Sequence, residues 1–124
     1  MNEDTQVRLT MAYRGVIDHL TSEMTCTEKG IIKDPNLGTV QDGVKAYYAK
    51  HLRILASKLL TSYYSVKDMT KWNEFKQYIK NTIDKENNVR SHRPKAETVA
   101  KIWAHNHVLH SMEIEEWYNE LPES

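Results

Sequence analysis

The chain has 124 residues, of which 40% are hydrophobic and 27% charged, and its formal net charge is zero. This composition excludes global disorder and predicts one folded domain spanning residues 1–124, which would bury about two-thirds of its unfolded surface. The single cysteine, Cys26, excludes an internal disulfide and a zinc cluster built from thiolates. Because the sequence has neither a signal-peptide pattern nor an apolar run near about 18 residues, we expect a cytoplasmic protein without membrane contact.

Apolar residues recur at spacings of three and four along the whole chain, and the alternation typical of strands is almost absent. The spacing predicts an all-α bundle of four main helices, or five if the last helix restarts at Ser111. The first helix is predicted to begin near Asp4 or Thr5 and to end within residues 27–30. Gly15 inside this helix indicates a site of close helix packing.

The second helix is predicted to begin at Thr39, after turn-forming residues at 34–38. Its apolar arc, within residues 40–63, is too broad for a helix with one neighbour, so we expect this helix to be central. The third helix is predicted to bury Met69, Trp72, Phe75, Ile79 and Ile83. Pro94 suits the first turn of a fourth helix, which ends before Pro122.

The last third of the chain carries the most informative pattern. Steps of four and three residues place six side chains on one helical stripe: Trp103, His107, His110, Ile114, Trp117 and Leu121. Leu or Ile is the ordinary choice at the two histidine positions. Three interpretations follow, namely a recognition surface, a metal site, or a core face with polar inserts.

The metal interpretation depends on the histidines. His107 and His110 are neighbours on a helix, His105 is close to them in sequence, and His51 is predicted on the inner side of the second helix. The candidate ligands are therefore His51, His107 and His110. The Glu-x-x-His and His-Glu-x-x-His patterns of helical metal sites are absent, so the sequence favours structural or interfacial histidines and no cofactor.

A second alternative is nucleic-acid binding by the basic stretch at residues 76–101. Residues 95–101 have a passing likeness to the second half of a helix-turn-helix. The candidate contacts are Arg90, Arg93, Lys95 and Lys101. The connector at residues 88–94 is longer than that motif tolerates, and the zero net charge opposes phosphate binding, so nucleic acid is the disfavoured partner.

Charge is unevenly distributed along the chain. Residues 67–101 contain nine basic and five acidic side chains, whereas residues 102–124 contain five acidic side chains and no Lys or Arg. We expect the basic and acidic segments to pair with one another. The sequence has no glycine-rich phosphate loop and no nucleophile motif, so we do not expect an enzyme.

These features favour a small intracellular regulator or inhibitor that acts without catalysis by binding a protein, and that also self-associates as a homodimer. Trp and Tyr are the residue types most enriched at binding hot spots, and acidic groups steer a partner. The predicted contact surface is Trp103, Glu113, Glu116, Trp117, Tyr118 and Glu120. Chains of this kind are common among phage-encoded and mobile-element-encoded proteins that block host machinery, so a viral origin is one interpretation.

Overall fold

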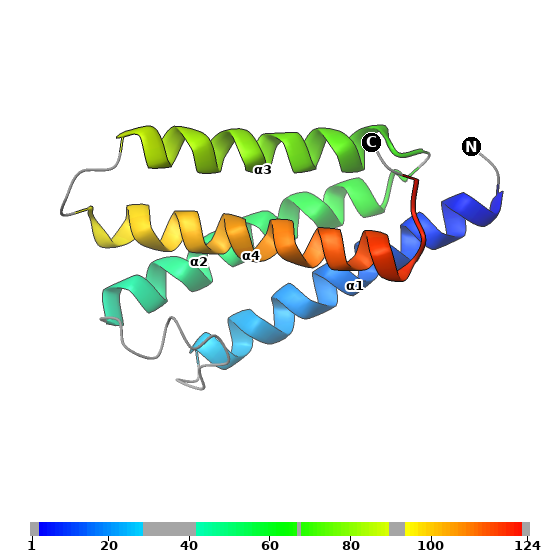
Figure 1. Cartoon of the computed structure of the whole chain (residues 1–124). Coiled ribbons are helices and arrows are strands. Elements are labelled where there is room, and N and C mark those ends of the chain that lie inside the picture. Colours follow the sequence, from blue (N-terminus) through cyan, green and yellow to red (C-terminus); the bar gives the residue numbers. More distant parts are fainter. Residues whose placement is uncertain (1–2, 29–41, 67, 90–93, 123–124) are drawn as a thin grey trace.

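The computed structural model describes residues 3–28, 42–66, 68–89 and 94–122 (Figure 1). Within these ranges the chain forms four helices and no strand. The helices are α1 (Glu3–Glu28), α2 (Asp42–Tyr63), α3 (Thr70–Val89) and α4 (Ala96–Tyr118). The predicted all-α fold with four main helices is confirmed. Helix α4 is continuous through Ser111, which decides between the two alternatives left open for this helix in favour of the unbroken one. The predicted start of the second helix at Thr39 lies outside the described residues.

Helices α2 and α4 pack extensively on each other, α1 lies against both, and α3 lies mainly along α4 (Figure 1). Helix α2 therefore has more than one neighbour, as its broad apolar arc predicts. Among the described helices, however, α4 is the one that packs extensively on all three others, so α4 is the most central helix of the bundle.

The core is formed by one face of each helix, and its fully buried side chains include Tyr13, Leu52, Trp72 and Met112. Three residues predicted for the inner face of the third helix, Trp72, Phe75 and Ile79, are buried as expected. The rings of Tyr13 and Trp72 meet edge to face at 4.9 Å between centroids, which ties α1 to α3. No helix in the described ranges is both long and apolar enough to cross a membrane.

The core face of α4 differs from the stripe that the sequence pattern suggests. The buried face contains a row of side chains at steps of four, Ala100, Ala104, Val108 and Met112, of which the two alanines are small. Small side chains let neighbouring helices approach closely. His110, Ile114 and Trp117 are exposed, so the interpretation of the whole stripe as a core face with polar inserts is wrong.

Gly15 marks the close approach of α1 to α4. A Cβ atom at this position would overlap the carboxylate of Glu115, which itself accepts a hydrogen bond from Asn119 Nδ2 at 2.9 Å. The predicted packing role of Gly15 is confirmed.

Candidate functional site

The end of α4 is shaped by a hydrogen-bonded C-cap of the Schellman type. The backbone N–H of Leu121 donates to the carbonyl oxygen of Glu116 at 2.9 Å, and that of Glu120 donates to Trp117 at 3.2 Å. Glu120 has a φ of 52°, the left-handed conformation that glycine usually adopts at this position. The turn buries Leu121 against the core and leaves Tyr118 exposed.

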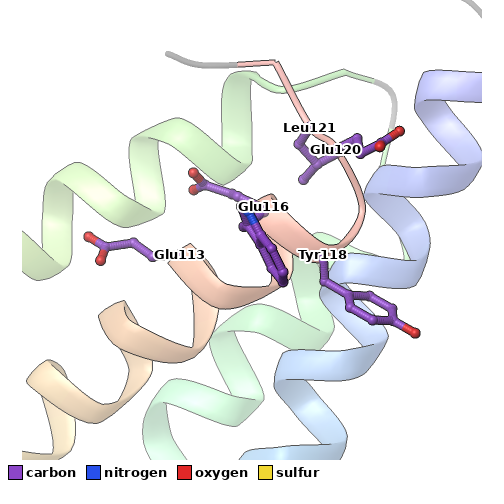
Figure 2. Close-up of a pocket in the computed structure, with 6 residues that line it drawn as sticks. Glu113, Glu116, Tyr118, Glu120 and Leu121 are labelled. Atoms are coloured by element: carbon purple, nitrogen blue, oxygen red, sulfur yellow. The ribbon is translucent and has the colours of Figure 1, made fainter.

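A cleft of about 570 Å³ lies beside this turn (Figure 2). It is lined by Glu113, Glu116, Trp117, Tyr118, Glu120 and Leu121. The side chains of Trp117 and Tyr118 are 81% and 73% exposed, and Ile114, three residues before Trp117, is 57% exposed. Figure 2 shows Tyr118 pointing to the side of α1, whereas Glu113 and Glu116 point to the opposite side. The cleft therefore combines large uncovered rings with carboxylates.

The carboxylates of the cleft have two different roles. Glu116 accepts a hydrogen bond from Trp72 Nε1 at 2.9 Å, and Lys76 Nζ lies 2.6 Å from the same oxygen. Both of these partners are buried side chains of α3, so Glu116 is committed to the bundle. Glu113 and Glu120 are exposed, and within the described residues their carboxylates have no hydrogen bond or ion pair.

Arg8 of α1 caps the last carbonyl groups of α4. Its guanidinium donates to the backbone oxygens of Asn119 and Glu120, and its Nε lies 3.1 Å from Asp4. The last turn of α4 contains no basic residue of its own, although the negative end of a helix dipole favours cations. Because Arg8 is shared with Asp4, the negative end of α4 is only partly neutralised.

The structure brings together five of the six predicted contact residues. Glu113, Glu116, Trp117, Tyr118 and Glu120 all line the cleft. Trp103 does not, because it is half-buried and packs against the core more than three turns earlier on α4. The ion pair between Lys76 and Glu116 also joins the basic middle segment to the acidic end, as predicted.

The histidines predicted as metal ligands point to different neighbours. His51 Nε2 lies 3.3 Å from Glu97, whereas the ring of His107 stacks on His19 of α1 at 4.9 Å between centroids. His110 is exposed. In the part of the chain that the structure describes, no three His, Cys, Asp or Glu side chains are placed to hold a metal ion. The set His51, His107 and His110 therefore does not form a metal centre in this structure.

Among the described residues the most deeply buried histidine is His105, which was not among the predicted ligands. It is 2% exposed, its Nδ1 is 2.7 Å from the carbonyl oxygen of Lys101, and its Nε2 has no hydrogen-bond partner among the described residues. Burial lowers the pKa of His105 to about 4, and burial also lowers the pKa of His51, whose ring is 6.3 Å away. Both imidazoles are therefore neutral at pH 7 and belong to the bundle interior.

The predicted nucleic-acid contacts are only partly described by the structure. Arg90 and Arg93 lie outside the described residues. Lys95 is exposed just before α4, and Lys101 forms an ion pair with Glu86 at 2.8 Å. The charge of Lys101 is thus already paired with an acidic side chain of α3.

Comparisons with known proteins do not indicate a function, so any assignment rests on the geometry of the cleft. No protein-family model matches the chain, and no curated protein and no solved structure matches it.

Proposed function

We propose that the chain is a regulator or inhibitor that acts without catalysis by binding another protein, and that the cleft at the end of α4 is its contact surface. The observation that carries this proposal is the exposure of Trp117 (81%) and Tyr118 (73%) side by side in a cleft. Exposed aromatic side chains grouped with a few polar groups are typical of interaction sites, and Trp and Tyr dominate binding hot spots.

The surroundings of the two rings favour binding without large rearrangement. Arg8 fixes the end of α4 to α1, and Lys76 and Trp72 fix Glu116 to α3. A contact surface that is already rigid loses little conformational freedom when a partner binds, and more of the interaction energy is then available for affinity. The carboxylates at the margin act mainly on the rate and specificity of association.

The same geometry supports a protein partner over a nucleic acid. Phosphate binding requires local positive potential, whereas the cleft is lined by three glutamates. We place the protein in the cytoplasm, because the half-buried thiol of Cys26 is free, as thiols are in reducing compartments.

The proposal is tested by affinity capture from the cells that naturally make the protein, with three baits. The baits are the unchanged chain, Trp117→Ala, and Tyr64→Ala as the matched control, because Tyr64 is an equally exposed aromatic (78%) on the turn after α2. We expect a protein that the unchanged and Tyr64→Ala baits retain and that the Trp117→Ala bait loses. Circular dichroism of each bait establishes that it is folded. Equal retention by all three folded baits would contradict the proposed surface.

A further inference from the structure

The aromatic cleft has a definite electrostatic character, which depends on which of its carboxylates are already paired. Glu116 is neutralised by Lys76, but Glu113 and Glu120 are exposed and have no partner among the described residues. Arg8, which lies at the end of α4, is occupied by Asp4 and by the carbonyl groups there. The cleft therefore presents two unpaired negative charges beside Trp117 and Tyr118.

The backbone adds to this negative charge. Helix α4 ends at the cleft, and the C-terminal end of a helix carries a partial negative charge that favours basic residues in the last turn. This helix has none there, and it places Glu115, Glu116 and Glu120 at or beside its end. Arg8 of α1 supplies only part of this missing positive charge, because it is shared with Asp4. Departures from a local stability rule are expected at functional sites. The missing cation is thus a feature that a partner can supply.

The exposed rings of Trp117 and Tyr118 favour arginine over lysine as the basic side chain of the partner. The guanidinium group of arginine stacks on the faces of Trp and Tyr and also pairs with carboxylates. One arginine side chain can therefore contact both an aromatic ring and a carboxylate. Lysine offers the charge and the cation–π contact without the planar fork. A neighbouring aliphatic or aromatic side chain on the partner would cover the remaining apolar area of Trp117, which is 81% exposed.

A second copy of the same chain fits this cleft poorly. In a two-fold dimer the same patch faces itself, so Glu113 and Glu120 of one copy would face the same acidic groups of the other. Like charges across an interface oppose association. Nucleic acids and anionic lipid surfaces are disfavoured for the same electrostatic reason.

Resting on the proposed function, we infer that the cleft at the end of α4 binds a basic segment of a partner protein, in which arginine or lysine stands beside an aliphatic or aromatic side chain. The apolar side chain packs on Trp117 and Tyr118. The cation is attracted by the carboxylates of Glu113 and Glu120, which line the same cleft as the two rings.

The experiment begins with selection from a display library of random peptides of about twelve residues on the immobilised full chain, a length suited to linear recognition segments. We expect the selected sequences to be enriched in arginine and lysine relative to the unselected library. Selection of neutral or acidic sequences, or no enrichment at all, would overturn the inference.

The best selected peptide is then titrated by fluorescence anisotropy against four forms of the full chain. These are the unchanged chain, Trp117→Ala, the double variant Glu113→Gln/Glu120→Gln, and the control Asp18→Asn/Asp84→Asn. The control removes the same number of negative charges from exposed positions on α1 and α3. We expect the dissociation constant to rise about ten-fold or more for Trp117→Ala, about five-fold or more for the glutamine variant, and less than about two-fold for the control.

Three outcomes separate the inference from the proposed function: one of this titration, one of capture from cells with Glu113→Gln/Glu120→Gln as an added bait, and one of analytical ultracentrifugation. If both double variants weaken binding equally, the peptide responds to net charge and the inference falls. If the protein captured from cells depends on Trp117 but not on Glu113 and Glu120, the proposed function stands and the basic partner class is wrong. A dimer in analytical ultracentrifugation that dissociates in Trp117→Ala would identify a second copy as the occupant and overturn the inference.

Discussion

Trp72 and Glu116 are joined by a hydrogen bond of 2.9 Å from the indole Nε1 to the carboxylate, so one of the acidic residues lining the cleft serves the interior of the bundle. The neighbouring Trp117 has the opposite role, because its ring is almost wholly in solvent. Of these two consecutive residues of α4, Glu116 therefore serves the packing of the bundle, whereas the role proposed for Trp117 is the binding of a partner.

Replacing Glu116 with Ala should lower the free energy of unfolding by about 3 kcal/mol, because Lys76 and the Trp72 indole N–H would be left buried without a partner. Urea unfolding followed by circular dichroism measures the change. The matched control is Glu113→Ala, an exposed position one turn earlier, which should stay within about 0.5 kcal/mol of the unchanged chain. Equal losses in the two variants would show that the internal role of Glu116 is wrong.

Replacing Glu120 with Gly should stabilise the chain by about 1 kcal/mol, because its φ of 52° is costly for a residue with a Cβ atom. The same substitution at Glu113, inside α4, should have the opposite sign and cost about 1 kcal/mol, since glycine loses more backbone entropy in a helix. Thermal and urea unfolding of the two variants give the comparison. Destabilisation by both substitutions would contradict the C-cap geometry.

The close approach of Gly15 to Glu115 predicts a coupled effect. Gly15→Ala gains about 1 kcal/mol of helix propensity, but the new methyl group displaces the Glu115 carboxylate from Asn119, which costs about as much. We expect almost no net change in the unchanged background and a clear stabilisation in the Glu115→Ala background. A double-mutant cycle measures this coupling. Identical effects of Gly15→Ala in the two backgrounds would contradict the contact.

The neutral state of His105 makes the stability depend on pH. Its pKa is about 4 in the folded chain and near 6.5 in the unfolded chain, so the unfolded chain binds more protons between these values. The free energy of unfolding should therefore fall by about 3 kcal/mol in all as the pH decreases from 6.5 to about 4. The lowered pKa of His51 acts in the same direction.

Urea unfolding at a series of pH values tests this dependence. His105→Asn should make the decline shallower, because the side chain that gains a proton on unfolding is gone. His110→Asn is the control, since this histidine is exposed and should leave the slope unchanged. The same slope in the unchanged chain and in His105→Asn would rule out His105 as its source.

Helical spacing in the sequence was sufficient to predict the number and order of the helices, because the period of about 3.6 residues is a local property. Which face of α4 is turned to the core could not be predicted in the same way. Its core face contains Ala100 and Ala104, and alanines give a weaker hydrophobic signal in the sequence than the aromatic stripe does. Only the close approach of neighbouring helices explains why small residues face inward there, and that is a property of the packed bundle.

The residue types of the cleft could be predicted from the sequence. Contacts between residues far apart in the sequence could not. Trp117 and Tyr118 stand out because aromatic side chains near the end of an acidic helix are typical of interaction surfaces. The commitment of Glu116 to the interior depends on Trp72, which is 44 residues away in the sequence, so no local pattern indicates it. Trp103, which was predicted to belong to the same contact surface, packs against the core outside the cleft, because helical spacing does not distinguish the margin of a core from an exposed face.

The most direct test of the proposed contact surface is site-specific photo-cross-linking in the cells that naturally make the protein. The photoreactive amino acid benzoylphenylalanine replaces Trp117 in one full-length variant and Tyr64 in the other, two positions of nearly equal exposure on different parts of the bundle. We predict that irradiation attaches a partner protein covalently at position 117 and not at position 64. No adduct at position 117, or the same adducts at both positions, would contradict the account.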